Sequence, residues 1–271
     1  EQAGRGDQTH MIDQHGRAVP SDGWAGRLLR ALDTRLMRFL LMQFDAHICL
    51  SPAFISKFSL QNVFVVPGIL NDDFKASVAA NSRVRQSSDT FDIIFAGGVS
   101  IDNGIDRLIC AFGSVDNLRA RLFIYGAGPL VGDVESAASR DTRIHYGGVL
   151  HGEALTCALL SASLLINPRP IGDEYAQTSF PSKLIEYMAT GVPTLTTRLL
   201  GIPDEVGDCF YFIDGDSEEN IAKALINVMN IPPSLRSAKG SVAAERASIL
   251  FSEASFGDRT YELLSQSCST V

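Results

Sequence analysis

The stretch FDIIFAGGVSIDNGIDRLICAF, residues 91–112, passes from an apolar run through a glycine-containing loop into a helical pattern. The same alternation continues along the chain, and it predicts a parallel sheet whose strands are connected by helices. Six runs have the length and apolar character of strands, and they cover residues 91–98, 120–126, 143–148, 163–168, 192–197 and 209–214. With right-handed crossovers, these runs predict an α/β fold with a doubly wound parallel sheet of the Rossmann type.

A smaller block lies upstream of this sheet. A long helical pattern covers residues 24–43, and two further strand candidates follow it at 45–51 and 62–68. This block is too small for a full domain. The stretch 75–90 is polar and poor in large apolar residues, and we interpret it as a linker or a loosely packed connection. A domain boundary is therefore expected between residues 67 and 90.

The composition excludes several classes of protein. The 271 residues carry a formal net charge of −8 and are 45% hydrophobic, which is typical of globular proteins without the basic excess of nucleic-acid-binding proteins. We therefore expect no nucleic-acid partner. Five cysteines without a CxxC pair favour thiols in a reducing compartment, and no run approaches the roughly 20 apolar residues of a membrane span. We expect a cytoplasmic protein, and no cluster of metal-ligating residues is evident in its sequence.

The helical pattern of residues 24–43 has two faces. At about 100° per residue, the arginines share one arc, and most of the large apolar side chains cluster on the opposite side. Two interpretations stay open: a core helix with a solvated polar face, or a helix that contacts an anionic membrane surface. The second would make the protein peripheral at the inner face of a membrane. The arginines are Arg27, Arg30, Arg35 and Arg38.

Loops that follow the strands are the candidate binding site, because ligands of doubly wound sheets bind beyond the carboxyl ends of the strands. The loop 97–104 contains glycines, which let a backbone approach a phosphate closely. The loop GAGP, residues 126–129, is a fragment of the GxGxxG fingerprint with Val131 where the third glycine belongs, and a tight strand-to-helix turn explains it equally well. This incomplete fingerprint argues against a dehydrogenase.

The connection within residues 166–180 is longer than most strand-to-helix loops, and loops of this length are often functional. Arg169 follows the strand directly, and Asp173 and Glu174 come a few positions later. The loop therefore brings a cation and two carboxylates to the same rim of the sheet. A solvated surface loop is the alternative explanation.

The helical pattern PSKLIEYMAT, residues 181–190, carries charged side chains in its first turns. A proline suits the first helical position, and it leaves the amides of Ser182, Lys183 and Leu184 free at the positive end of the helix dipole. Such an end is an anion site. We expect Lys183 to neutralise a phosphate and Glu186 to accept hydrogen bonds from sugar hydroxyls, with an exposed Lys–Glu pair as the alternative.

The string SFPSKLIEYMATGVPTLTT, followed by GIPDEV, resembles the nucleotide-sugar half of glycosyltransferase family four. The motifs FAGGVSIDNGIDRLICAF, LFIYGAGP and IHYGGVL precede it in order, and the resemblance covers roughly residues 63–260. Members of this family are retaining enzymes with two facing Rossmann-like domains, and variants with SFPSK resemble enzymes of bacterial surface polysaccharide synthesis. The resemblance implies transfer of a sugar from a UDP or GDP donor to a hydroxyl of a glycan or lipid-linked acceptor, without a cofactor or metal.

The resemblance also implies that the chain is truncated upstream. Residues 1–66 then correspond to the incomplete C-terminal part of an acceptor-side domain, residues 67–250 to the donor-binding domain, and residues 251–271 to a helix that crosses back to the first domain. In the family, a histidine often ends a first-domain strand that faces the donor. His10 and His15 are the candidates for this role, and a loop histidine without a role is the alternative.

The family's paired-glutamate motif is half present. Glu186 matches the second glutamate, which implies that it binds the ribose hydroxyls, whereas Thr178 stands where the first glutamate belongs. Contact with the transferred sugar is then expected from Thr178 itself, Asp173 or Glu174. The segment that contains Gly201 is expected to close over the donor sugar.

The cations of the family's first loop are missing. Asn103 stands where the lysine belongs, so that Lys183 and Arg169 are the candidates to replace it at the diphosphate. With Glu186 and His15, these two cations form the expected catalytic set. The residues expected around the nucleotide and its diphosphate come from the loops and the first helical turn: Gly97, Gly98, Asn103, Gly126, Gly128, Val149, Ser182, Lys183, Leu184 and Glu186.

Two alternatives keep the fold and change the function. The missing glutamate and lysine, together with the short first block, favour a non-catalytic module that binds a nucleotide sugar. A nucleotide-sugar epimerase of the same fold would need an additional acid and base in place of an acceptor site.

Overall fold

The fold is described by a computed structural model, which covers residues 24–49, 55–56, 58–66, 68–82, 89–172 and 180–268. The predictions made for His10, His15, Asp173, Glu174 and Thr178 lie outside the described residues.

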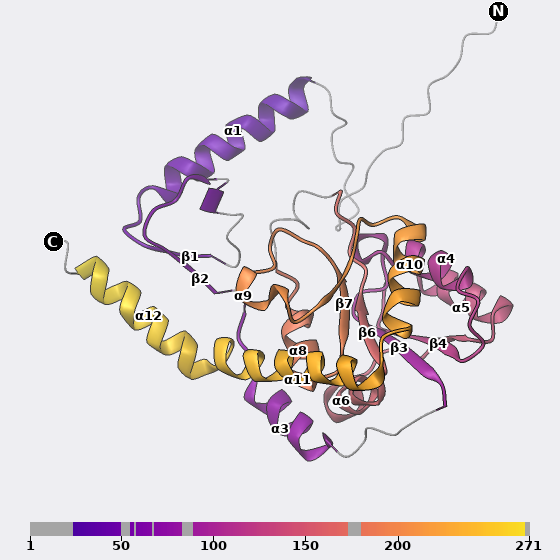
Figure 1. The fold of residues 1–271 in the computed structure, drawn as a ribbon. Coiled ribbons are helices and arrows are strands. Elements are labelled where there is room, and N and C mark those ends of the chain that lie inside the picture. The colour runs from indigo at the N-terminus through magenta and orange to yellow at the C-terminus, as the bar shows by residue number, and fades with distance from the viewer. Residues whose placement is uncertain are drawn as a thin grey trace, which may run out of the picture.

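Six parallel strands form the central sheet, in the spatial order β5-β4-β3-β6-β7-β8 (Figure 1). The chain runs outward from β3 to β5 and then returns to place β6 on the other side of β3. This order confirms the predicted doubly wound sheet, and it puts the topological switch point between β3 and β6. The strands are β3 (Phe91–Ala96), β4 (Ala120–Tyr125), β5 (Ile144–Tyr146), β6 (Leu164–Asn167), β7 (Thr194–Thr197) and β8 (Tyr211–Ile213).

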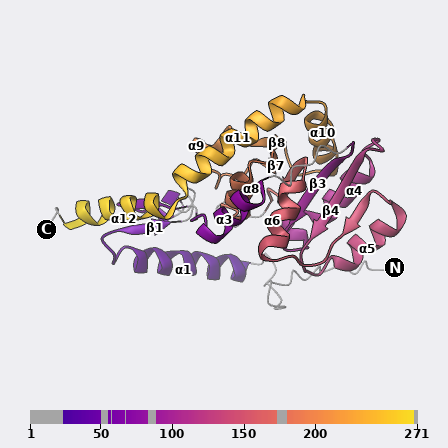
Figure 2. The same cartoon turned by 90° about the horizontal axis from the view of Figure 1, so that it is seen from below.

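Helices cover both faces of the sheet (Figures 1 and 2). Because side chains alternate along a strand, Ile93 and Phe95 join the core on one face, whereas Ile94 joins the core on the other. The first core is covered by α4 (Ile105–Gly113), α5 (Val131–Arg140) and α10 (Glu218–Met229). The second is covered by α3 (Asp72–Ala80), α6 (Gly152–Ser161), α8 (Lys183–Thr190), α9 (Asp204–Gly207) and α11 (Pro233–Leu250).

Helix α3 corrects one interpretation of the sequence. The stretch from residue 75 was interpreted as a loose connection, but residues 75–80 are helical, and α3 packs against α6 and α8. Asn71 caps the helix by accepting hydrogen bonds from the amides of Asp73 and Phe74. The apolar side chains of residues 75–80 are small, and for this reason the pattern resembled a linker. The predicted domain limits stay predictions.

Helix α11 was not anticipated from the sequence. Its buried positions are occupied by small residues, among them Gly240, Ala243 and Ala247, so an apolar periodicity is hard to see. A Cβ atom at Gly240 would collide with the carbonyl group of Gly191, which follows α8. A glycine at this position therefore allows α11 to lie directly against the end of α8.

The upstream block contains α1 (Trp24–Leu41) and a second parallel sheet of β1 (His47–Cys49) and β2 (Val63–Val65). These elements confirm the predicted helix and the two predicted strands. The C-terminal helix α12 (Glu253–Cys268) contacts β2, and the block lies to one side of the large sheet (Figures 1 and 2). Among the helices described, none combines the length and hydropathy needed to cross a membrane.

Candidate functional site

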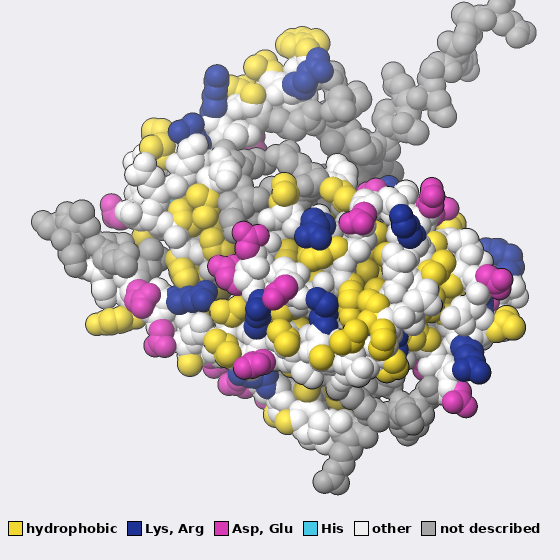
Figure 3. Space-filling view, in the orientation of Figure 1, with side chains coloured by type: hydrophobic (Ala, Val, Ile, Leu, Met, Phe, Trp, Pro, Cys, Tyr) yellow, Lys and Arg dark blue, Asp and Glu magenta, His cyan; other side chains and the backbone are white. Residues whose placement is uncertain are grey.

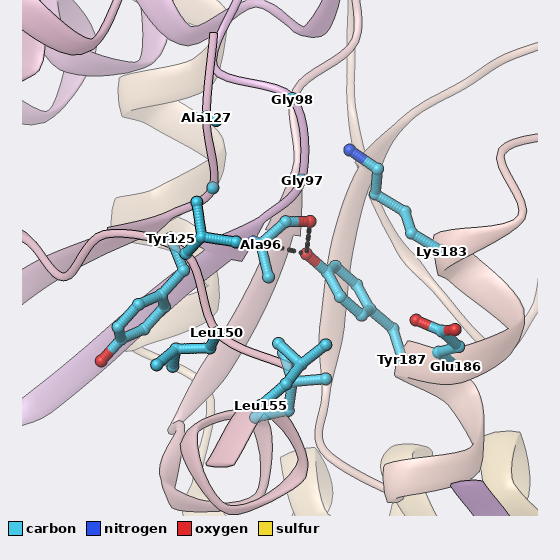
Figure 4. Close-up of a pocket in the computed structure, with 13 residues that line it drawn as sticks. Ala96, Gly97, Gly98, Tyr125, Ala127, Leu150, Leu155, Lys183, Glu186 and Tyr187 are labelled. Atoms are coloured by element: carbon cyan, nitrogen blue, oxygen red, sulfur yellow. Dashed lines mark hydrogen bonds between the residues drawn. The ribbon is translucent and has the colours of Figure 1, made fainter. Parts of the chain in front are cut away.

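A cavity of about 320 Å³ lies beyond the carboxyl ends of β3 and β4, next to the switch point (Figure 4). Six residues that the sequence singled out line it: Gly97, Gly98, Gly126, Val149, Lys183 and Glu186. Ala127 and Leu150 belong to the loops 126–129 and 148–151, which the family resemblance places around the nucleotide. The other lining residues were not predicted, and most are apolar: Ala96, Tyr125, Leu155, Leu159 and Tyr187. The cavity therefore has a charged wall on α8 and an apolar wall formed by α6 and the loops after β4 and β5.

Two glycine loops form one side of the cavity through direct backbone packing. The Gly97 amide donates to the Tyr125 carbonyl over 3.0 Å, and the Gly126 amide donates to the Gly148 carbonyl over 2.7 Å. Gly126 has a φ of 134°, and a Cβ atom there would collide with the carbonyl oxygen of Gly97. The close approach of the two loops therefore depends on a glycine at position 126.

Lys183 extends from the start of α8 to the first glycine loop (Figure 4). Its Nζ atom lies 4.4 Å from the centre of the Phe95 ring and donates to Asn103 Oδ1 over 3.4 Å. A Cβ atom on Gly97 would lie 2.6 Å from Nζ, so the ammonium group is held against the glycine backbone. The ammonium group of Lys183 is thus fixed beside a glycine loop whose backbone can approach an anionic ligand closely.

Burial lowers the pKa of Lys183 to about 8. The charge of Arg169 acts in the same direction, and the carboxylate of Glu186 opposes both effects. Burial raises the pKa of Glu186, and the neighbouring Lys183 limits that rise. Each charged group on this wall is therefore desolvated, and an anionic ligand beside Lys183 would be stabilised more than in water.

The start of α8 differs from the prediction in one respect. The amide of Leu184 donates to the carbonyl of Pro181 over 2.9 Å, and the Leu184 side chain is fully buried in the second core. The prediction of a free Leu184 amide is therefore wrong, whereas the place of Leu184 beside the nucleotide stays a prediction. Within the described part of the chain, the amides of Ser182 and Lys183 donate no hydrogen bond, so the helix end offers two donors.

Four further predicted residues lie outside the set that lines the cavity, and two of them contact the first glycine loop. Asn103 donates from Nδ2 to the Gly98 carbonyl and to Ser100 Oγ, and thereby braces the first glycine loop. Gly128 packs against the backbone of Val99. Arg169 is partly buried and near enough to Lys183 to affect its pKa, whereas Gly201 is buried. None of the four lines the cavity.

Tyr187 is the residue that the sequence analysis missed at the centre of this site. It directly follows Glu186, and its hydroxyl bonds to the backbone of Ala96 at the end of β3 (Figure 4). The signal available in the sequence was a tyrosine four residues after Lys183, a spacing that puts both side chains on one side of a helix. No group of three or more metal-ligating side chains occurs in the residues that the structure describes.

Comparison with known families gives a match over the large sheet. The family model described as glycosyl transferases group 1 matches residues 90–230, just over half of the chain. The matched segment contains the whole six-stranded sheet and the residues that line the cavity. No curated protein matches the chain in sequence.

Several solved structures share the fold. Sucrose-phosphate synthase from Thermosynechococcus elongatus superposes with a TM-score of 0.69 at 17% identity, over 88% of this chain and 62% of its own. A glycosyltransferase from Rickettsia africae gives 0.65 at 11% identity, over 83% and 64%. HepE from Anabaena, solved in complex with UDP, gives 0.64 at 15% identity, over 87% and 68%. The chain thus spans less than two thirds of the first two structures, and the likeness extends to the fold alone.

Proposed function

The chain belongs to the group 1 glycosyl transferases, and from this premise we propose that it transfers a sugar from a nucleoside diphosphate donor to an acceptor hydroxyl. The observation that carries the proposal is that Lys183 and Glu186 face one cavity together with two glycine loops at the switch point. Because the chain spans less than two thirds of two fold neighbours, the activity, substrates and partners of the whole protein all belong to this proposal.

The diphosphate is proposed to lie beside the first glycine loop, in contact with both its backbone and the ammonium group of Lys183. During transfer, the bond between the anomeric carbon and the diphosphate breaks, the acceptor oxygen bonds to the same carbon, and the proton of the acceptor hydroxyl passes to an oxygen of the diphosphate. Negative charge develops on the leaving diphosphate before that proton arrives. A buried ammonium group and fixed amides stabilise such charge most effectively in a site that excludes water. Arg169, which influences Lys183 electrostatically, is proposed to add a second positive charge.

The nucleoside is proposed to occupy the remainder of the cavity. Glu186 would accept hydrogen bonds from the ribose hydroxyls, and the base would lie against the apolar wall near Tyr125 and Leu150. The donor sugar is proposed to contact Gly201 and the predicted residues Asp173, Glu174 and Thr178. The UDP complex of the fold neighbour HepE supports uridine nucleotides as the first ligands to test, with GDP as the second.

The finer features of the reaction are also proposals. We propose transfer with retention to a glycan or lipid-linked acceptor, in the synthesis of a cell-surface polysaccharide at the cytoplasmic side of a membrane. The anomeric configuration of the product, measured by NMR, tests retention. We further propose that neither a metal ion nor a cofactor is needed, so chelation with EDTA should leave turnover unchanged.

Titration calorimetry with UDP and with GDP tests the proposed function, and Glu186→Gln is the informative variant. Hydrogen bonds to a charged group contribute about 1.5–3 kcal/mol, so we expect Glu186→Gln to weaken binding of the preferred nucleotide roughly 10-fold to 100-fold. Glu245→Gln removes the same charge from an exposed position on α11 and should bind as tightly as the wild type. Binding of neither nucleotide by the wild type would refute the proposal, and binding without turnover would indicate a nucleotide-sugar-binding module.

A membrane surface is the proposed partner of α1. The side chains of Leu28, Leu36 and Phe39 are 52%, 58% and 64% exposed. These exposed apolar side chains argue against the interpretation of α1 as a core helix. Arg27 and Arg38 are exposed on the same helix, and Figure 3 shows hydrophobic and basic side chains next to each other along α1. A helix with an apolar face bordered by cations is suited to the interface of an anionic membrane.

Co-sedimentation with phosphatidylglycerol vesicles tests this partner. Each arginine near an anionic surface contributes about 1 kcal/mol, so the double reversal Arg27→Glu/Arg38→Glu should weaken vesicle binding at least 10-fold. Phosphatidylcholine vesicles provide the uncharged control. Sedimentation that is unaffected by charge reversal would contradict the proposal and would favour a protein surface as the partner of this face.

A further inference from the structure

Tyr187 places a buried hydroxyl beneath the cavity. Its side chain is 1% exposed, and burial raises its pKa, so the hydroxyl stays protonated. The hydroxyl donates to the carbonyl oxygen of Ala96 over 3.1 Å and accepts from the amide of the same residue over 2.9 Å. Ala96 is the last residue of β3 and directly precedes Gly97 and Gly98, which line the cavity (Figure 4). The hydroxyl therefore links α8 to the base of the glycine loop.

The backbone of Ala96 faces a gap in the sheet. On one side, β3 stays paired with β4 up to Ala96 itself, whereas on the other side its register with β6 includes Ile93 and Ile94 only. The amide and carbonyl groups of successive strand residues point alternately to the two neighbouring strands. The Gly97 amide donates to β4, so the groups of Ala96 point to the β6 side, where the two strands have separated.

This separation is what opens a crevice at a switch point, and it would leave the polar groups of Ala96 without partners. Ala96 is partly buried, and a backbone group that is shielded from water without a partner costs up to the free energy of a lost hydrogen bond. The hydroxyl of Tyr187 satisfies both groups at once. The Tyr187 hydroxyl thus makes the hydrogen bonds to Ala96 that a paired β6 would otherwise make.

We propose that Tyr187 is a positioning residue, whose two hydrogen bonds to Ala96 fix the distance between the glycine loop and the charged wall of the cavity. Lys183 and Glu186 lie on the same helix as Tyr187, one turn and one residue before it, so the link sets the loop directly against them. The inference rests on the proposed function, because it concerns how that site is held in shape for a nucleoside diphosphate.

The test compares Tyr187→Phe with a matched control, Thr190→Val. The Thr190 hydroxyl is also buried on α8, donates to the Tyr187 carbonyl over 2.6 Å and accepts from the Val192 amide over 3.1 Å. Each substitution removes a buried hydroxyl that both donates to and accepts from backbone groups, and we expect a similar loss of thermal stability. Only Tyr187→Phe should weaken binding of UDP or GDP, by about 10-fold or more in calorimetry.

Two further readouts separate positioning from a general structural role. Hydrogen exchange should show the Ala96 amide protected in the unliganded wild type, more than 10-fold less protected in Tyr187→Phe, and unchanged in Thr190→Val. The alkaline midpoint of nucleotide binding should rise in Tyr187→Phe, because a displaced loop exposes Lys183 to water, and should stay unchanged in the control.

An unprotected Ala96 amide in the wild type would overturn the inference, and this measurement does not depend on the folding of any variant. Wild-type affinity in a folded Tyr187→Phe would overturn it as well. If the wild type binds neither nucleotide, the proposed function fails, and exchange at Ala96 still decides whether the link exists.

Discussion

Gly126→Ala is expected to abolish nucleotide binding and to lower the free energy of unfolding by about 2–5 kcal/mol. Two effects act together at this position. The φ of 134° disfavours any residue with a side chain, and the added Cβ would collide with the carbonyl oxygen of Gly97. Because that contact is between two backbones, no side-chain rotation can relieve it. The loops must separate, and the cavity between them changes shape.

Gly132→Ala is the matched control for this prediction. Gly132 lies in α5, a few residues beyond Gly126, and a Cβ atom there meets no atom within 4 Å. Alanine is favoured over glycine in a helix, so the free energy of unfolding of this variant should equal that of the wild type or exceed it by up to about 1 kcal/mol. Urea unfolding and calorimetry measure both variants. Equal stability and equal affinity of Gly126→Ala and Gly132→Ala would show that the loops do not need the close approach.

The sheet could be predicted from the sequence because its strands are short apolar runs with glycine, proline or polar residues after them. Each of the six predicted runs contains a strand of the structure. Two helices escaped the same reasoning. The buried residues of α11 are a glycine and two alanines, and Gly240 lies against the end of α8. Helix α3 has no buried residue, and its apolar residues beyond Phe74 are small. Packing of small residues depends on the approach of two backbones, which an apolar periodicity does not reveal.

The sequence could predict those site residues whose position is determined by the end of a strand. Gly97, Gly126 and Val149 follow strands β3, β4 and β5, and the rule for doubly wound sheets brings such loops to one edge. The bond between Tyr187 and Ala96 was not predictable, because it depends on where β3 and β6 separate, and register is a property of the assembled sheet. The local turn before α8, which occupies the Leu184 amide, likewise appears only in the folded backbone.

Lys183→Met is expected to make the unliganded protein more stable and a poorer binder. Burial lowers the pKa of Lys183 from its ordinary 10.5 to about 8, so at pH 7 the folded protein holds a charged group that its surroundings disfavour. Between pH 8 and 10.5 the unfolded chain binds more protons at this position than the folded chain. The free energy of unfolding of the wild type therefore rises with pH through that range, as the cost of the buried charge disappears. Below pH 8 the charge costs roughly 1–3 kcal/mol, which methionine removes.

The same substitution removes the cation that the proposed function places at the diphosphate, and we expect nucleotide affinity to fall at least 10-fold. Urea unfolding at pH 7 and at pH 10.5 measures the first effect, since the advantage of Lys183→Met over the wild type should shrink at the higher pH. Lys223→Met, at an exposed position of α10, controls for the loss of one charge. A variant that is less stable at pH 7 and binds UDP or GDP as tightly as the wild type would show that Lys183 serves packing and not the diphosphate.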